Sequence, residues 1–242
     1  MGGRCLPSPD SGERIYAIGD VHGRYDLLQI LLAKIRDHSD SLPPTPSLYV
    51  IIIGDMIDRG PQSAEVLALV HDLHRTSDHV IALLGNHEDA MLQALDGDVD
   101  ALRGWLAVGG GETLASFGIA RLQPGEDPHA YIRRARDAVP RDWIAWLRRL
   151  PLSVRSGDYH FVHAGIRPGI SLDSQTRADM LWIREDFLSD SRDHGAVVVH
   201  GHTITATVQM CSNRIGIDTG AYRTHHLSAL YLEGTNRDVL VT

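Results

Sequence analysis

The chain has 242 residues, of which 43% are hydrophobic and 22% charged, and its formal net charge is −8 at pH 7. This length and composition predict one globular domain with a sizeable core, spanning residues 1–242, and the negative charge argues against a broad nucleic-acid-binding surface. We find no apolar stretch that could cross a bilayer and no apolar core of a secretion signal at the N-terminus, so we expect no membrane partner and a cytoplasmic location.

Five short apolar runs along the chain each end directly at an Asp, Asn or His. The endings are Gly19-Asp20-Val21-His22-Gly23, Gly54-Asp55, Gly85-Asn86-His87, His163 and His200-Gly201-His202. Runs of β-branched residues bounded by glycine predict strands that are buried on both faces. Open α/β sheets place their ligands at the carboxyl ends of such strands. The five endings together therefore predict a metalloenzyme.

Helices are predicted after the first three of these runs. Apolar residues recur at helical spacing from Leu27 to Ile35 and from Val66 to Leu73, and Pro61 suits the start of the second helix. A third helix is expected from Glu88 to about Leu95, which puts His87 at or near its N-terminus. The first half of the chain is thus expected to be βαβαβ.

The middle of the chain, residues 97–150, has a different character. It contains Gly109-Gly110-Gly111, a proline-containing loop and a helix that ends near Leu147. We interpret it as a helical insertion that could cap one side of the site. From Leu152 onward short strands dominate the pattern, so a second sheet is expected. These strands are expected at Tyr159 to Val162, Ala196 to Val199, Val208 to Met210, Ile215 to Ile217 and Leu227 to Leu232.

The polar residues at the strand ends suit a pair of divalent cations. Asp20 and His22 are two positions apart, so in an extended segment both can bind one ion, and Asp55 could bridge to a second. The ligands expected to complete the second ion are Asn86, His163 and His202. Two such ions lower the pKa of a shared water, which makes a hydroxide the expected nucleophile, and their surplus positive charge favours a phosphate ester as substrate.

The donor types limit the choice of metal. Carboxylate, imidazole and amide donors without sulfur favour manganese first, with iron, zinc or magnesium as alternatives. The two cysteines, Cys5 and Cys211, lack pair spacing and are expected to be reduced thiols.

Four further residues have the chemistry that phosphoryl transfer needs. His87 could protonate the leaving oxygen, and Asp58 could orient its imidazole by accepting the other N–H. Arg59 and Arg184 could bind non-bridging phosphate oxygens through their guanidinium groups. The alternative is that Asp58 and Arg59 form a surface ion pair and that Arg184 is a solvated helix residue.

The motifs resemble those of the calcineurin-like metallophosphoesterase superfamily, and in particular its bacterial phosphoprotein (serine/threonine) phosphatase branch. The resemblance rests on G-D-V-H-G at 19–23, G-D-M-I-D-R-G at 54–60, G-N-H-E at 85–88, His163 and G-H-T at 201–203. It implies an α/β (α+β) fold in which a two-sheet β-sandwich is flanked by helices in a four-layer αββα order. It also implies that Asp20, His22 and Asp55 hold one metal, that His87 is the general acid with Asp58 as its partner, and that Arg59 and Arg184 bind phosphate. The second metal is implied to be held by Asp55, Asn86, His163 and His202.

Two features bear on the substrate. Leu84 stands where phosphoprotein phosphatases usually carry a phosphate-binding arginine, which leaves the choice between phosphoserine or phosphothreonine and phosphotyrosine open. The related hydrolases of symmetrical dinucleoside tetraphosphates typically lack an acidic residue at the position of Asp58 and carry Asp in place of Glu88. These two positions therefore favour the phosphatase branch.

We thus predict a dinuclear-metal phosphomonoesterase that acts on phosphoprotein serine or threonine, by direct attack of a metal-bridging hydroxide. The partner would be a phosphorylated protein or peptide, or a small phosphate ester. A second enzymatic interpretation is a dinucleoside polyphosphate hydrolase or nucleotidyl phosphodiesterase. A third interpretation is a metal-bearing scaffold that binds phosphorylated partners without turnover, although such a scaffold has no need of an acid such as His87.

Overall fold

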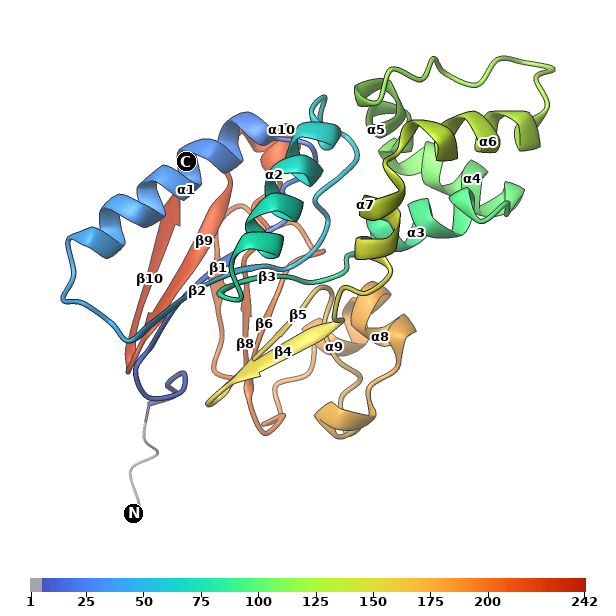
Figure 1. Ribbon diagram of the computed structural model, residues 1–242. Coiled ribbons are helices and arrows are strands. Elements are labelled where there is room, and N and C mark those ends of the chain that lie inside the picture. The colour runs from blue at the N-terminus through green and yellow to red at the C-terminus, as the bar shows by residue number, and fades with distance from the viewer. Residues whose placement is uncertain (1–5) are drawn as a thin grey trace.

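The structure is a computed structural model, and it describes residues 6–242 (Figure 1). The expectations about Cys5 and about a signal in the first residues fall on residues 1–5, outside the described part. Cys211 is a free cysteine. Among the described residues, no helix combines the length and the apolar character needed to span a membrane.

The first sheet has five strands in the order β10-β9-β1-β2-β3. Its strands are β1 (Glu13–Ile18), β2 (Ser47–Ile52), β3 (Val80–Ala82), β9 (Ser228–Glu233) and β10 (Asn236–Val241). β1, β2 and β3 run parallel, with Ile18 opposite Ile52 and Ile52 opposite Ala82. The three parallel strands therefore end at the same level of one sheet edge.

The second sheet has five strands in the order β4-β5-β6-β8-β7. Its strands are β4 (Ser153–Ser156), β5 (Tyr159–Val162), β6 (Val197–His200), β7 (Gln209–Met210) and β8 (Arg214–Gly216). β5, β6 and β8 are parallel, and they pair Phe161 with Val199 and His200 with Gly216. The loops that carry His163 and His202 thus leave this sheet at its own carboxyl edge.

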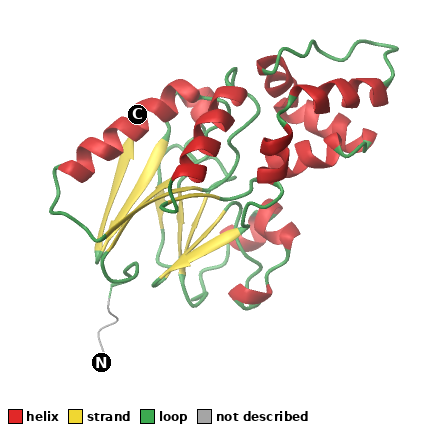
Figure 2. Cartoon of the chain, in the orientation of Figure 1, coloured by secondary structure: helices red, strands yellow, loops and turns green. Residues whose placement is uncertain are grey.

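Helices lie outside both sheets, as Figure 2 shows. They are α1 (Tyr25–Asp40), α2 (Ser63–Thr76), α3 (Asn86–Leu95), α8 (Arg177–Trp182), α9 (Glu185–Leu188) and α10 (Ala221–Thr224), with a 3-10 turn at Leu172–Ser174. The parallel strand β1 buries both faces: Ile15 and Ala17 pack between the two sheets, whereas Tyr16 and Ile18 pack against α1 and α2. Burial on both faces explains the unbroken apolar run in the sequence. The predicted two-sheet sandwich flanked by helices is confirmed.

The segment 97–150 is helical, as expected. It contains α4 (Val99–Trp105), a π-helical turn (Leu106–Gly110), α5 (Gly111–Ser116), α6 (Pro128–Ala138) and α7 (Arg141–Leu147). α4 and α6 pack against α3, and α5 packs against α2. Its apolar residues, including Trp105 and Tyr131, belong to the same core cluster as α1 and α2. The insertion and the first sheet therefore share one hydrophobic core.

The sequence pattern missed α8, α10, β4 and β10. The two helices have six and four residues, which is too short for a helical period to show. β10 is an edge strand of mixed burial, so its sequence lacks the apolar run that reveals the central strands.

Candidate metal centre

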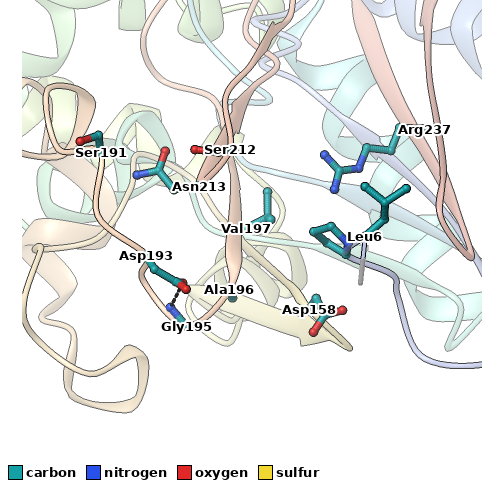
Figure 3. A pocket seen from close by; sticks show the side chains of 11 residues that line it. Leu6, Asp158, Ser191, Asp193, Gly195, Ala196, Val197, Ser212, Asn213 and Arg237 are labelled. Atoms are coloured by element: carbon teal, nitrogen blue, oxygen red, sulfur yellow. Dashed lines mark hydrogen bonds between the residues drawn. The ribbon is translucent and has the colours of Figure 1, made fainter. Parts of the chain in front are cut away.

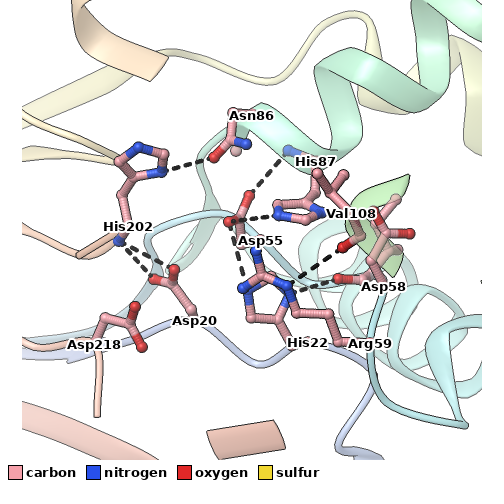
Figure 4. A network of polar contacts seen from close by, with 12 residues as sticks. Asp20, His22, Asp55, Asp58, Arg59, Asn86, His87, Val108, His202 and Asp218 are labelled. Carbon is pink, nitrogen blue, oxygen red and sulfur yellow. Dashed lines mark hydrogen bonds and ion pairs between the residues drawn. The ribbon is translucent and has the colours of Figure 1, made fainter. Parts of the chain in front are cut away.

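Residues from five strand ends meet at one edge of the sandwich (Figure 4). The glycines in the motifs allow the close approach. A Cβ added to Gly85 would overlap the backbone nitrogen of Asp55, and one added to Gly201 would overlap the carboxylate of Asp20. Glycine before the ligand residue is therefore a packing requirement of this centre.

The backbone of the centre is strained. Among the described residues, the non-glycine residues with positive φ are His22, Asp55, Asp58, Arg59, His202 and His225. Five of these six are candidate site residues. Left-handed backbone conformations are costly for non-glycine residues and concentrate at functional sites, where the surrounding fold holds them in place.

One compact group of donor atoms is formed by Asp55, His163 and His202. Oδ2 of Asp55 lies 3.4 Å from Nε2 of His163. Oδ1 of Asn86 lies 2.8 Å from Nε2 of His163 and 2.8 Å from Nδ1 of His202. The structure thus brings together the four residues that were assigned to the second ion.

A second compact group is formed by His22, Asp55 and His87. Oδ2 of Asp55 lies 3.6 Å from Nε2 of His22 and 3.8 Å from Nε2 of His87. Asp55 belongs to both groups, as its expected bridging role requires. Arg59 donates from Nη1 to Nε2 of His22 over 2.7 Å. This hydrogen bond and a metal bond at the same nitrogen exclude each other, because the nitrogen has one lone pair.

Asp20 lies beside these groups without joining either. Its carboxylate accepts the backbone N–H of His202 at 3.0 Å and faces Asp218, as Figure 4 shows. Asp218 is fully buried, and its Oδ2 has no hydrogen-bond partner. Burial and the facing carboxylate raise the pKa of Asp20, and burial raises that of Asp218 to about 6. Sequence reasoning missed Asp218, although its position after the apolar pair Ile215 and Ile217 repeats the pattern of the other strand ends.

The donor set fits divalent cations. Ligand atoms about 2.1 Å from one cation lie roughly 3–3.4 Å from each other, close to the separations in both groups. Burial lowers the pKa of His22 to about 3 and that of His202 to about 2, so both imidazoles are neutral at pH 7. Nε2 of His202 has no hydrogen-bond partner, whereas Nε2 of His22 is free for a metal only when Arg59 moves away. A bound cation would also favour the charged forms of the two buried, facing carboxylates of Asp20 and Asp218, whose pKa values Arg59 alone does not bring down to the usual range.

His87 is held by a buried hydrogen-bond chain. Its Nδ1 lies 2.6 Å from Oδ2 of Asp58. Asp58 in turn accepts from Nε1 of Trp105 at 2.8 and 3.0 Å and from Oγ1 of Thr113 at 2.6 Å. Burial lowers the pKa of His87, but the carboxylates of Asp55 and Asp58 outweigh this effect and raise it above the usual histidine value. Trp105 and Thr113 come from the insertion, and the sequence analysis gave neither a role at the site.

Glu88 also has a structural role at the centre that the sequence did not indicate. Its buried carboxylate accepts the backbone N–H groups of Asp55, Met56, Ile57 and Gly85 at 2.8–3.1 Å. Burial and the Asp55 carboxylate raise the pKa of Glu88, and these N–H donors oppose that rise. Glu88 thus ties the loop that carries Asp55 to the start of α3, which carries Asn86 and His87.

The two candidate phosphate binders lie on different sides of the centre. Arg59 lies beside His22, with its guanidinium carbon 4.9 Å from the centre of the Tyr222 ring. Gly109 adopts a φ of 117°, and the carbonyl oxygens of Val108 and Gly109 accept hydrogen bonds from Arg59. Arg184 is exposed and donates to the carbonyl oxygen of His202 over 3.4 Å.

A separate cavity of about 560 Å³ lies at the opposite edge of the second sheet, among the loops that precede β5, β6 and β8 (Figure 3). Its lining includes Leu6, Asp158, Asn213 and Arg237. None of the candidate site residues lines this cavity.

This arrangement agrees with sequence comparison. The profile of the calcineurin-like phosphoesterase family matches residues 13–231. The chain belongs to this family. Its His and Asp residues are positioned to bind metal ions, and the superfamily expected from the motifs is confirmed.

Comparison with relatives helps to decide between the tetraphosphatase and phosphatase branches of the family. A symmetrical bis(5'-nucleosyl)-tetraphosphatase of Aromatoleum aromaticum is 32% identical over 156 residues, which are 64% of this chain and 45% of the relative. The chain spans about half the length of the curated relatives it matches. A crystal structure assigned to a diadenosine tetraphosphatase has a TM-score of 0.66 at 20% identity and covers 98% of both chains. A cold-active protein-tyrosine phosphatase of Shewanella has a TM-score of 0.53 at 20% identity and covers 97% of this chain and 83% of its own.

These two structural likenesses show a shared fold. The serine/threonine phosphatase branch, which Asp58 and Glu88 favoured, is not confirmed, because the curated relatives carry the tetraphosphatase name. The names of these relatives agree better with a dinucleoside polyphosphate hydrolase, the second enzymatic interpretation, than with a protein phosphatase, the first.

Proposed function

We propose that the protein is a metal-dependent hydrolase of phosphoric esters and anhydrides, and that Asp55 is shared by two divalent cations. The observation that supports this most strongly is that Oδ2 of Asp55 belongs to both compact donor groups. One cation would be held by Asp20, His22 and Asp55, which requires that the Asp20 carboxylate turn towards Asp55 and that Arg59 leave Nε2 of His22. The other would be held by Asp55, Asn86, His163 and His202. Manganese is proposed for both positions because all donors are oxygen or imidazole nitrogen.

The bound cations would supply an activated water and neutralise charge on the phosphoryl oxygens. The chain's own residues would donate the proton and bind the phosphate. Asp58 fixes Nδ1 of His87, so the proton that His87 gives to the leaving oxygen must come from Nε2. Arg59 and Arg184 approach from opposite sides and would bind the phosphoryl oxygens that carry the developing negative charge.

The proposed substrates are symmetrical dinucleoside polyphosphates, of which diadenosine tetraphosphate is the test case. Water would attack one of the two middle phosphorus atoms, and the P–O bond that bridges them would break. Two nucleoside diphosphates would leave, with release of two protons once both new terminal phosphates are ionised. The names of the curated relatives support this substrate class. A paired site with an arginine on each side also suits a chain of several phosphates.

The test is a direct comparison of substrates. Manganese-loaded protein is offered diadenosine tetraphosphate, a phosphoserine peptide and a phosphotyrosine peptide, and kcat/KM is measured for each. We expect the highest kcat/KM for diadenosine tetraphosphate, with ADP as its sole nucleotide product. A higher kcat/KM for either peptide, or formation of AMP and ATP, contradicts the proposal.

Phosphoprotein serine, threonine or tyrosine is the second candidate substrate class. The buried pair of His87 and Asp58 favours it, because an alkoxide is a poor leaving group that needs a proton donor, whereas a nucleoside diphosphate leaves more readily. The same pair argues against a scaffold that binds phosphorylated partners without turnover.

A further inference from the structure

Trp182 differs from the other tryptophans in its exposure. Its side chain is 48% exposed, whereas Trp105 and Trp146 are 1% and 5% exposed and Trp143 is half-buried in the insertion. Leaving an indole open to water forgoes the stabilisation that its burial would give. Single exposed apolar residues are common on protein surfaces, so the meaning of this one depends on its position.

The position of Trp182 is at the rim of the metal centre. It is the last residue of α8, and its ring centre lies 6.2 Å from that of His202, with the two rings nearly perpendicular at 84°. His202 contacts His163 in the same way, at 5.1 Å. Trp182 thus adjoins the donor group of Asp55, His163 and His202. Among the described residues, its ring contact is this edge contact, which leaves indole surface open to a ligand.

Arg184 accompanies Trp182 on this side. It lies two residues further along the chain and donates to the carbonyl oxygen of His202. It is close enough to the centre to contribute to the lowered pKa of both His163 and His202. A ligand that stacks on Trp182 would therefore find the Arg184 guanidinium beside His202, the residue that the indole also contacts.

The opposite side of the centre has the same pair of residue types. The Tyr222 ring lies 5.4 Å from the His22 ring at 83°, and the Arg59 guanidinium lies over Tyr222. Each donor group thus has one aromatic ring and one arginine beside it. The Tyr222 ring is already in contact with Arg59, whereas the Trp182 ring has no cation over it among the described contacts. Trp182 is the better stacking surface of the two.

We propose that Trp182 is a nucleobase-binding residue: its indole stacks on one base of the substrate while Arg184 binds the phosphates next to that nucleoside. This inference rests on the proposed function, because it requires a nucleotide substrate. Stacking of a base on an aromatic side chain is sequence-tolerant, so purine and pyrimidine nucleotides should both use it. The protein would then recognise the nucleoside as well as the phosphate chain.

Binding of reaction products tests Trp182 without turnover. Calorimetry with the manganese-loaded protein compares ADP with inorganic pyrophosphate, which has the same two phosphates and no base. For Trp182→Ala we expect the Kd for ADP to rise about tenfold or more and the Kd for pyrophosphate to stay within twofold. Trp182→Phe, which keeps a ring, should recover most of the ADP affinity. Ile30→Ala is the matched control, because Ile30 is 47% exposed on α1, and it should change neither Kd.

Fluorescence of the unaltered protein gives a second measurement. Because Trp182 is the tryptophan most open to solvent, stacking of ADP should quench the emission more than pyrophosphate does, and the difference should vanish in Trp182→Phe. Equal weakening of ADP and pyrophosphate binding in Trp182→Ala would overturn the inference, because it indicates a role in positioning His202. Failure of the unaltered protein to cleave diadenosine tetraphosphate overturns the proposed function instead, and the product-binding comparison decides on Trp182 separately.

Discussion

Nε1 of Trp105 donates to both carboxylate oxygens of Asp58, over 2.8 and 3.0 Å. Both side chains are almost completely buried. Trp105 ends α4 of the insertion, whereas Asp58 lies in the loop after β2, 47 residues earlier in the chain. The insertion therefore supplies part of the hydrogen bonding of the candidate acid pair, in addition to covering it.

Trp105→Phe removes this donor and leaves a ring in the core. Asp58 then keeps its contacts with His87 and Thr113 but loses a charge-assisted hydrogen bond, so we expect the free energy of unfolding to fall by about 2–3 kcal/mol. We also expect a lower kcat on phosphoserine peptide, because Asp58 is then held less firmly and orients His87 less precisely. Urea unfolding and steady-state kinetics measure the two effects. Trp143→Phe is the control, since Trp143 packs against Phe117 in the same insertion. If Trp143→Phe lowers kcat as much as Trp105→Phe does, Trp105 has no specific role in positioning Asp58 and His87.

Thr113→Val keeps the shape of the side chain and removes its hydroxyl. Oγ1 of Thr113 donates to Oδ1 of Asp58 and accepts the backbone N–H of Asp58 over 2.8 Å, so the variant loses both contacts. We expect a fall of about 1–3 kcal/mol in the free energy of unfolding, because the buried Asp58 carboxylate loses a hydrogen-bond donor and the Asp58 N–H keeps only its contact with Oγ of Ser63 at 3.0 Å. Thr113→Ser restores the hydroxyl and should recover most of the loss. If valine is tolerated as well as serine, the hydroxyl has no such role.

His87→Asn tests the proton donor through the leaving group. Loss of a general acid typically costs 10²–10⁴ in rate where the leaving group needs a proton, as serine does. The terminal phosphate of a nucleoside diphosphate has a pKa of roughly 6, so its departure needs little help at neutral pH. The kcat on phosphoserine peptide should therefore fall much further than the kcat on diadenosine tetraphosphate. Equal losses on both substrates would contradict the assignment of His87 as the acid.

The strand ends were predictable from the sequence, whereas the groups that support them were not. Asp55 and His87 follow apolar runs, and parallel strands bring the ends of such runs to one sheet edge. Trp105 and Thr113 are 47 and 55 residues from Asp58, and no local pattern links a tryptophan or a threonine of a helical insertion to a distant carboxylate. The fold explains two glycines of Gly109-Gly110-Gly111: a Cβ on Gly109 would overlap Arg59, and one on Gly110 would overlap the Trp105 ring, whereas Gly111 faces open space.

The sequence also could not show where each side chain lies within the centre. Spacing alone put Asp20 with His22, because alternate residues of an extended segment share a face. The φ of His22 is 46°, so the segment is not extended there, and the Asp20 carboxylate lies nearer His202 and Asp218. Left-handed residues of this kind are set by tertiary packing.

His160 should make the fold sensitive to acid. It is 5% exposed on β5, and neither ring nitrogen has a hydrogen-bond partner. Burial, assisted by Arg155 and opposed by Asp173, lowers the pKa of His160 to about 4. As pH falls, His160 therefore takes up a proton in the unfolded chain before it does so in the folded chain. The folded state is destabilised once pH falls below about 6.5, by about 2 kcal/mol at pH 5, and the effect is complete near pH 4.

Unfolding of His160→Leu at several pH values measures this effect. The variant should gain about 2 kcal/mol over the unaltered protein when pH falls from 7.5 to 5, because it has lost the group that titrates. His129→Gln is the control, since His129 is exposed, and its stability should follow that of the unaltered protein. A constant difference between His160→Leu and the unaltered protein at all pH values would contradict the prediction.

The central claim is that Asp55 is shared by two cations, and calorimetric titration of metal-free protein with Mn²⁺ tests it most directly. We predict that the unaltered chain binds two ions and that Asp55→Asn weakens both binding events, because Oδ2 of Asp55 belongs to both donor groups. Binding of no ion or a single ion by the unaltered chain, or undiminished binding of two ions by Asp55→Asn, would contradict the account.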